Sequence, residues 1–234
     1  MAGLSLADNW INLNQKIQIA AEMSGRSIED ILFIGISKFQ SHDKIEALYH
    51  LGCKAFGESY VPELVTKQVA LSGLDIQWHF VGRLQTNKVK KVVGTVDLIH
   101  SVDRLSLGEE IDKRAAHIST VQPILVQVNI HEEESKAGVH IEKVPKLLEQ
   151  LQRLPHIRIQ GLMSMPPLFA TESESRQSFA KVRELLMTWK DYLDPMHPFD
   201  QLSMGTSHDY EAAILEGATM IRLGTVLFGE RPSR

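Results

Sequence analysis

Short apolar segments alternate with amphipathic helical patterns along the whole chain, and this alternation constrains the fold more than any other feature. The first segment, residues 31–37, carries no charge, which is typical of a strand that is buried on both faces. Helical patterns space apolar residues three or four positions apart, as in Trp10, Leu13 and Ile17. The predicted strands cover residues 31–37, 54–59, 76–82, 97–102, 122–130, 157–165, 199–205 and 219–224. The predicted helices cover residues 6–21, 42–52, 61–73, 87–94, 103–117, 142–154, 173–193 and 207–217.

This order of elements predicts an α/β protein whose strands are parallel, because parallel neighbours need helical crossovers between them. Eight strand–helix units are the number that closes a (β/α)8 TIM barrel, and 234 residues fall within its usual size of about 200 to 400. An open doubly wound sheet is the alternative. No Gly/Ser-rich linker divides the chain, so we expect a single domain over residues 1–234.

The composition limits which partners and which cellular compartment are expected for this chain. A net charge of −4, with lysines and arginines scattered, argues against a nucleic-acid-binding protein. The one local basic cluster, residues 87–91, is typical of a solvated helix face. Cys53 is the single cysteine, which excludes an intrachain disulfide and suits a reducing compartment, with a small buried side chain as its expected role. No signal peptide and no apolar run long enough to span a membrane are recognisable, so we expect a cytoplasmic protein.

Lys38 directly follows the first predicted strand. In a barrel, side chains at the carboxyl ends of the strands form the active face. An amine held in a dry place has a lowered pKa, and its neutral form attacks carbonyl groups to give a Schiff base. A surface lysine whose ammonium reaches water would have the same position in the sequence. Position alone therefore leaves both roles for Lys38 open.

Small and hydroxyl-bearing residues follow the last two predicted strands. Ser203 and Ser207 come with the seventh strand, and Gly224 and Thr225 follow the eighth. Barrels often bind phosphate at this place, where glycine allows close approach of the backbone and hydroxyl groups donate to the phosphate oxygens. The alternative is that Thr206 or Ser207 caps the next helix, in a capping box that Asp209 completes; the two roles are compatible.

Two polar residues fall inside predicted strands. Arg222 lies in the eighth strand, where a buried charge is costly unless it meets an acceptor, although an outward-facing arginine is the alternative. His79 is expected to be a hydrogen-bonded side chain within the barrel. The histidines near strand ends lack partners at metal-ligand spacing, so no metal site is predicted. A Schiff-base lysine, a phosphate site and an inward arginine together indicate pyridoxal 5′-phosphate (PLP), with its aldehyde at Lys38 and its ring nitrogen at Arg222.

The same residues lie within stretches that resemble the YggS/PROSC family of pyridoxal phosphate homeostasis proteins. The matching stretches are GISKFQ, KAFGESYVPEL, WHFVGRLQTNKVK, IHSVDRL, VQVNIHEEESKAGV, GLMSMPP and LSMGTSHDYEAAILEGATMIRLGTVLFGER. The resemblance implies a single PLP fold type III-like barrel, related to the barrel domain of alanine racemase but without its C-terminal β-domain. It also implies that Lys38 carries PLP as a Schiff base. Phosphate-binding positions match Ser203, Gly224 and Thr225, with Ser207 a further candidate, and Arg222 matches the arginine that faces the pyridine nitrogen.

The chain departs from the family pattern at two positions. Ser59 replaces an asparagine near the cofactor, and the smaller side chain leaves room for water. Gln40 stands where many bacterial members carry a second lysine. Any role of that lysine in transferring or accepting the cofactor is therefore in doubt for this chain.

Two classes of function fit the resemblance. The first is a carrier that binds PLP, takes part in vitamin B6 homeostasis and has no substantial catalytic turnover. Such a carrier is expected to be a monomer and to pass PLP to apo forms of PLP-dependent enzymes. The second is an amino-acid racemase or a related fold-type-III enzyme. A racemase of the alanine racemase kind needs a second, β-rich domain and a tyrosine base from a partner subunit, which the sequence does not provide, so we expect the carrier. A Schiff-base aldolase acting on a sugar phosphate is a third reading.

Overall fold

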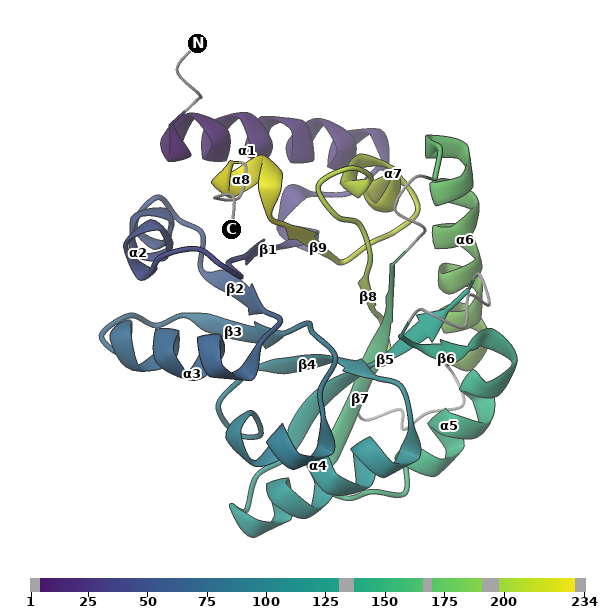
Figure 1. Cartoon of the computed structure of the whole chain (residues 1–234). Coiled ribbons are helices and arrows are strands. Elements are labelled where there is room, and N and C mark those ends of the chain that lie inside the picture. The colour runs from purple at the N-terminus through teal and green to yellow at the C-terminus, as the bar shows by residue number, and fades with distance from the viewer. Residues whose placement is uncertain (1–4, 131–136, 166–169, 191–197, 230–234) are drawn as a thin grey trace.

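The computed structural model places the strands in a closed ring with helices around it (Figure 1). It describes residues 5–130, 137–165, 170–190 and 198–229. Neighbouring strands follow the order β4-β3-β2-β1-β9-β8-β7-β5, and pairing of β4 with β5 closes the ring. Every pairing in this ring is parallel. The predicted (β/α)8 barrel is therefore confirmed, and the open doubly wound sheet is excluded.

Each of the eight predicted strands forms within the residues that were expected. The strands are β1 (Leu32–Ile36), β2 (Ala55–Glu58), β3 (Gln77–Phe80), β4 (Leu98–Val102), β5 (Gln122–Asn129), β7 (Ile157–Ser164), β8 (Gln201–Ser203) and β9 (Met220–Leu223). One further strand, β6 (Val139–His140), was not predicted and pairs with the end of β5 outside the ring. Two residues are too few for a period-two pattern to be recognised in a sequence.

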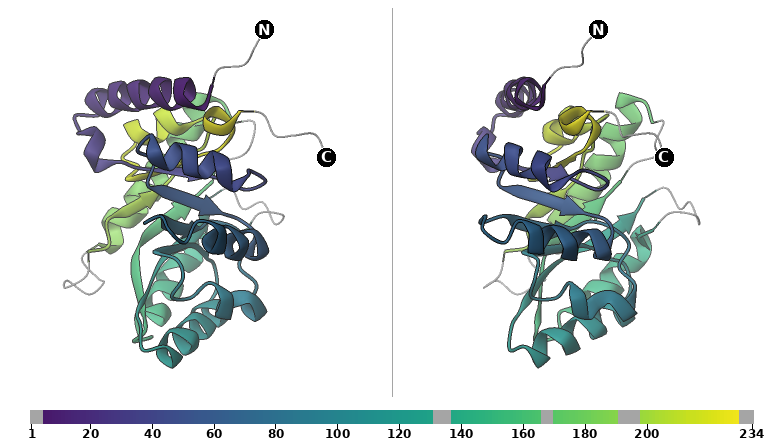
Figure 2. Two further views of the ribbon diagram at one scale, coloured as in Figure 1. Left: turned by 90° about the vertical axis from the view of Figure 1, so that its left-hand side faces the viewer. Right: turned by 60° about the vertical axis from the view of Figure 1, so that its left-hand side comes forward.

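Residues 86–91 form a 3-10 helix where the helix 87–94 was predicted, and the α-helices otherwise follow the predicted order. They are α1 (Leu6–Met23), α2 (His42–His50), α3 (Val61–Ala70), α4 (Leu105–His117), α5 (Val144–Leu151), α6 (Glu172–Trp189), α7 (Tyr210–Leu215) and α8 (Thr225–Phe228). Three short 3-10 helices are η1 (Ile28–Asp30), η2 (Thr86–Lys91) and η3 (Ile141–Lys143). Helix α1 packs outside the barrel against α7 and α8, as both views of Figure 2 show. Residues 191–193 of the long predicted helix lie outside the described residues.

Side-chain capping fixes the start of α6 but not that of α4. Thr171 and Glu174 form a reciprocal capping box at the start of α6, which fixes its first turn. The predicted helix 103–117 begins at Asp103, which has the chemistry of an N-cap residue, but Arg104 is the N-cap residue of α4 and makes no side-chain cap bond. Asp103 instead accepts from Arg104 Nη1 at 2.6 Å. The 87–91 basic cluster lies on η2 with its lysines exposed and only Val89 buried, as expected of a solvated face.

The interior of the barrel changes from apolar to polar along its axis. At the amino-terminal end it is closed by an apolar layer that consists of Ile34, Ala55, Leu98, Leu125, Met163 and Met220. Side chains two residues further along a strand point to the same side. In β4, β5 and β9 these are the buried polar residues His100, Gln127 and Arg222. The barrel therefore has an apolar floor and a polar upper layer towards the carboxyl ends of its strands.

The larger part of the core lies between the barrel and its helices. Phe179, Val182 and Leu186 form the buried face of α6, as their helical spacing predicted. Cys53 is buried, as expected, and its burial raises the pKa of the thiol to about 12. No helix among the described residues is both long enough and apolar enough to cross a membrane.

Candidate functional site

A cavity of about 1430 Å³ opens at the carboxyl ends of the strands, the face where barrel active sites form. It brings together all but one of the predicted site residues, although they come from distant parts of the chain. The predicted residues that line it are Lys38, Ser59, Ser207, Arg222, Gly224 and Thr225. Ser203 is the exception and lies elsewhere.

Lys38 follows the end of β1 and lines the cavity wall. The next residue, Phe39, has a φ of +64°, a left-handed conformation that is unusual for a bulky side chain. Gln40 is buried and does not line the cavity; its Oε1 atom accepts from Lys44 at 2.9 Å. The position where bacterial relatives often carry a second lysine thus faces α2 in this chain.

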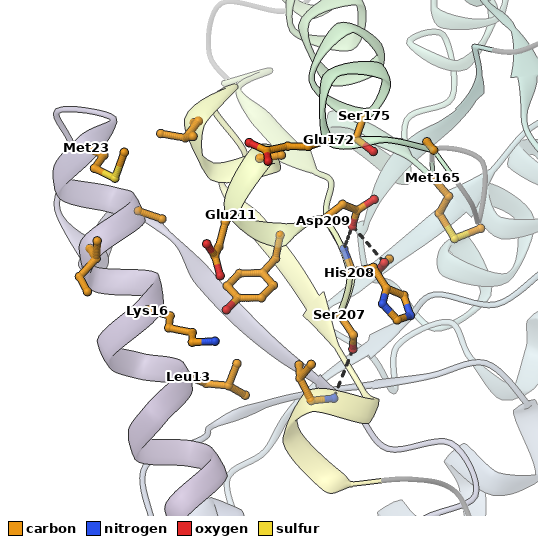
Figure 3. A pocket seen from close by; sticks show the side chains of 18 of the residues that line it. Leu13, Lys16, Met23, Met165, Glu172, Ser175, Ser207, His208, Asp209 and Glu211 are labelled. Carbon is orange, nitrogen blue, oxygen red and sulfur yellow. Dashed lines mark hydrogen bonds between the residues drawn. The ribbon is translucent and has the colours of Figure 1, made fainter.

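A hydroxyl group and two backbone amides meet where the last strand ends. Ser207 Oγ accepts from the N–H of Gly224 at 3.2 Å and of Val226 at 3.5 Å, the second of which Figure 3 draws. A Cβ atom added to Gly224 would lie 3.6 Å from the nearest protein atom, so the protein itself does not require glycine there. Because Gly224 and Thr225 both line the cavity, the open space above them is where an anion would approach these groups.

The predicted capping role in this loop is only partly correct. Asp209 Oδ1 accepts from the Thr206 N–H at 2.6 Å and from its hydroxyl at 3.0 Å, so the Thr206–Asp209 pair does form. However, Asp209 is itself the N-cap residue of α7, and no side chain caps the helix. Ser207 contacts the start of α8 instead of capping α7, which leaves its hydroxyl at the cavity.

Arg222 extends from β9 into the barrel and is only 4% exposed, which confirms the inward orientation. Its Nη1 atom donates to Ser203 Oγ at 2.6 Å, and Nη2 donates to the carbonyl oxygen of Ser164 at 3.0 Å. Burial lowers the pKa of the guanidinium to about 10, and the nearby Asp209 carboxylate opposes this shift. Arg222 therefore remains a cation at neutral pH and can only donate hydrogen bonds.

Ser203 lies behind Arg222 and does not line the cavity, so its predicted contact with the phosphate stays a prediction. The side chain is fully buried, and its hydroxyl also contacts His100 Nδ1 at 2.8 Å. Strand alternation explains the difference: the Ser203 side chain enters the barrel interior, whereas Ser207 lies in the loop above it. Ser207 is thus the serine of this loop that lines the cavity.

The contacts of Ser203 continue into a pair of buried histidines. His100 Nε2 lies 2.9 Å from His79 Nδ1, which confirms His79 as a hydrogen-bonded residue inside the barrel. Burial lowers the pKa of His79 to about 4 and that of His100 well below its usual value, so both rings are neutral. Since Arg222 donates to Ser203, the hydroxyl proton of Ser203 goes to His100 Nδ1, and His100 Nε2–H then donates to His79.

The charge of the cavity wall was not foreseen from the sequence. Five basic side chains line the cavity, and no described residue that lines it is acidic, in a chain whose net charge is −4. Besides Lys38 and Arg222, the basic residues are Arg83, Lys88 and Arg104. They come from the segments that follow β3 and β4, so only the fold gathers them. Such a surface attracts anionic ligands.

A second hollow of about 1180 Å³ adjoins the cavity and lies between α1, α6 and α7. The two share Ser207 and His208, which Figure 3 shows beside Asp209, with Lys16 on the facing helix. Tyr210 on this side is buried, and burial followed by the neighbouring Glu211 raises its pKa. Among the described residues, no group of three or more His, Cys, Asp or Glu side chains could hold a metal ion.

The fold and the cavity define a class of protein: parallel eight-stranded barrels with a lysine after β1 and a cavity at the carboxyl ends of the strands. The model of the family described as alanine racemase, N-terminal domain, matches residues 35–232. Relatives named pyridoxal phosphate homeostasis protein match almost the whole chain. That of Aquifex aeolicus is 45% identical over 93% of this chain and 94% of its own length, and that of Escherichia coli is 36% identical over 97% of each. The chain therefore belongs to the family of pyridoxal phosphate homeostasis proteins.

Solved structures give the same result. PipY of Synechococcus elongatus with PLP bound has a TM-score of 0.84 and 33% identity, and covers 96% of this chain and 100% of its own. Alanine racemase of Clostridium difficile in complex with cycloserine has a TM-score of 0.71 at 16% identity, which shows a shared fold. This chain spans 58% of that enzyme's length.

Proposed function

We propose that this protein binds PLP in the cavity, attaches it covalently through Lys38 and serves in vitamin B6 homeostasis without substantial catalytic turnover. The proposal rests mainly on one observation: Lys38, Arg222 and the group of Ser207, Gly224 and Thr225 all line the same cavity. The PLP bound in the PipY structure and the names of the curated relatives support the same ligand.

The residues present fit the cofactor at its phosphate end. The Ser207 hydroxyl and the backbone of Gly224 and Thr225 surround open space, and a side chain at Gly224 would fill part of it. No acidic residue among those described at the cavity would repel a phosphate dianion. We assign phosphate binding to Ser207, Gly224 and Thr225, and we assign Ser59 to the wall of the cofactor site, where it lines the same cavity.

The covalent step is assigned to the side chain of Lys38. PLP supplies an aldehyde carbon, to which a neutral amine adds; the aldehyde oxygen leaves as water and a carbon–nitrogen double bond forms. Lys38 must lose its proton before it attacks, because only the neutral amine is a nucleophile. Lys38 lines the same cavity as Ser207, Gly224 and Thr225.

Arg222 is assigned the contact with the pyridine nitrogen, and this contact would account for the proposed low turnover. A carboxylate at that place would favour a protonated ring, which withdraws electrons from the substrate. The Arg222 guanidinium can only donate, so it favours the neutral nitrogen. Ser203 and Ser164 hold the guanidinium by two hydrogen bonds. The chain thus binds an aldehyde cofactor firmly while it provides little of the electron withdrawal that catalysis needs.

The proposal extends to the setting of the protein. Apo forms of PLP-dependent enzymes are the proposed recipients, and the chain is proposed to act as a single-domain monomer over residues 1–234. The cytoplasm is the proposed location, since the one cysteine, Cys53, is a buried free thiol. These proposals are tested by size-exclusion chromatography and by transfer of PLP to a purified apoenzyme.

The central experiment is a visible absorbance spectrum of purified protein with PLP, before and after borohydride, followed by peptide mass mapping. We expect a reducible chromophore whose adduct maps to Lys38. The Lys38→Ala variant is expected to lose the covalent adduct while it still retains PLP through the phosphate site. A reducible adduct at normal stoichiometry in Lys38→Ala would contradict the assignment.

A further inference from the structure

A buried lysine on α3 bonds to the backbone immediately before Lys38. The Lys67 ammonium donates to the carbonyl oxygen of Ser37 at 2.6 Å and to Glu58 Oε1 at 2.6 Å. The Ser37 hydroxyl donates to the same carboxylate oxygen at 2.6 Å. Ser37, Glu58 and Lys67 are all buried, and none of the three lines the cavity. The peptide group that leads into Lys38 is therefore held from behind.

The same ammonium is linked to the residue that follows Lys38. Lys67 Nζ lies 3.1 Å from Glu63 Oε2, and this oxygen also accepts from the Phe39 N–H at 2.8 Å. Phe39 has a φ of +64°, and its hydrogen bond to Glu63 offsets part of the cost of that conformation. An ammonium has three N–H groups, and all three of Lys67 are engaged. The contacts thus hold the main chain on both sides of Lys38.

Stability of the fold alone does not account for this cluster. A buried ion pair contributes little more than apolar side chains of similar volume, because both charges lose their hydration. Burial raises the pKa of Glu58 even though Lys67 opposes the shift, so the desolvation cost is felt at this site. Glu58 Oε2 moreover has no hydrogen-bond partner. The buried contacts therefore cost free energy of folding, and what they fix is the main-chain geometry of the segment around Lys38.

We propose that Lys67, together with Glu58 and Glu63, positions the main chain at Lys38 so that its amine meets the aldehyde carbon of the bound cofactor. The inference rests on the proposed function, since Lys38 is the assigned point of attachment. With both neighbouring peptide groups fixed, the amine varies only through its own side-chain torsions. Productive attack needs approach to about 3 to 3.5 Å, and a misplacement of ~1 Å costs up to about a hundredfold in rate. The three residues act through Lys38 and are positioning residues.

Glu63 gives the sharpest test, because its side chain is 27% exposed and its removal leaves Lys67 paired with Glu58. Apo-protein is mixed with PLP, and covalent attachment is followed by stopped-flow absorbance. Glu63→Ala is expected to slow attachment about tenfold or more. Glu63→Gln keeps an oxygen that can accept from the Phe39 N–H, so it is expected to restore most of the wild-type rate. The matched control is Glu110→Ala on α4, which removes an equivalent i,i+4 ion pair with a 23% exposed carboxylate, and its rate is expected to be unchanged.

A second variant removes both buried charges together. Lys67→Met with Glu58→Gln leaves neither of the two buried charges unpaired, so folding is preserved better than with either change alone; the partly exposed Glu63 carboxylate stays and still accepts from the Phe39 N–H. Borohydride trapping should then show a smaller covalent fraction of the PLP that is bound, while phosphate-dependent binding persists. The control pair is Arg183→Met with Glu216→Gln, a partly buried ion pair between α6 and the end of α7. Its covalent fraction is expected to match the wild type.

The outcomes separate the two proposals. If the wild-type protein traps no PLP on Lys38, the proposed function fails and the positioning role fails with it. If the wild type does trap PLP, and Glu63→Ala and the double variant attach it at the wild-type rate and fraction, only the positioning role is overturned. Equal slowing in Glu110→Ala would also overturn it, because the effect would then follow helix stability. Should the double variant not fold, the rates of the two Glu63 variants decide.

Discussion

Replacement of Ser203 by alanine should destabilise the protein, because this serine is a buried link between Arg222 and His100. The change removes the acceptor of Arg222 Nη1 and the donor to His100 Nδ1. Each buried polar group left without a partner costs about 1 to 3 kcal/mol, so the loss is about 2 to 6 kcal/mol. That is a large part of the ~5 to 15 kcal/mol typical of a folded domain. With a urea slope of about 3 kcal/mol/M, the midpoint should fall by roughly 1 to 2 M.

Ser207→Ala is the contrasting variant, since its hydroxyl lines the cavity and accepts only long bonds of 3.2 and 3.5 Å. The apo-protein should unfold at nearly the wild-type urea concentration. Loss of one charge-assisted hydrogen bond to phosphate, worth about 1.5 to 3 kcal/mol, should weaken PLP binding about ten- to a hundredfold. Urea unfolding of the apo forms and equilibrium titration with PLP separate the two effects.

The reverse pattern would contradict the roles given to Ser203 and Ser207. If Ser203→Ala weakened PLP binding as much as Ser207→Ala and left the urea midpoint of the apo-protein unchanged, Ser203 would be a phosphate ligand after all. The placement of the serine behind Arg222 would then be wrong, and so would the order of contacts that leads to the two histidines.

Four further results are expected. Pyridoxal without its phosphate should bind far more weakly than PLP in equilibrium titrations, and equal affinities would contradict the phosphate site. Chiral chromatography of single amino acids incubated with the PLP-loaded protein should show no turnover near the ~1 to 1000 per second of ordinary enzymes; multiple turnovers abolished by Lys38→Ala would favour a racemase. Because burial lowers the pKa of His79 from 6.5 to about 4, the unfolded chain binds more protons between these values. The contribution of neutral His79 to the free energy of unfolding is therefore fully present above pH 6.5 and should fall by about 3 kcal/mol as the pH drops to 4. Urea midpoints measured across this pH range should show the fall, and the fall should be smaller in His79→Gln. Finally, the Cys53 thiol, with its pKa raised to about 12, should resist maleimide until the protein is unfolded; rapid labelling of folded protein would contradict its burial.

Much of the fold could be predicted because its signals are local. Each buried strand forms a short apolar run, and its length and neighbours are read directly from the sequence. Interior polar residues such as Arg222 were recognised because a charge within such a run needs an acceptor. Boundaries were less certain: Asp103 has the chemistry of an N-cap residue, but its pairing with Arg104 prevailed over the cap. Strand β6, with two residues, left no pattern at all.

The omissions at the site have a common physical cause, which is that a sequence shows proximity along the chain and not the side from which a residue approaches. Ser203 and Ser207 are four residues apart and chemically equivalent, yet one points into the barrel and the other lines the cavity. Lys67 contacts Ser37 from thirty residues away, and no local pattern marks that pair. One sign was available in the sequence: Lys67 follows Glu63 by four residues on a predicted helix, a spacing that indicates an ion pair. Its contact with Glu58 is visible only in the fold.

The apolar floor of the barrel gives the proposed cargo a single route in and out. The six side chains of Ile34, Ala55, Leu98, Leu125, Met163 and Met220 close the amino-terminal end. A polar, phosphorylated molecule does not cross such a layer, so arrival and departure share the opposite opening. A proposed recipient enzyme that docked over that opening would block escape of the cofactor to the solvent during transfer. Transfer of the cofactor to a recipient and its release into solvent would thus compete at the same opening. Whether a recipient covers the opening would decide between them.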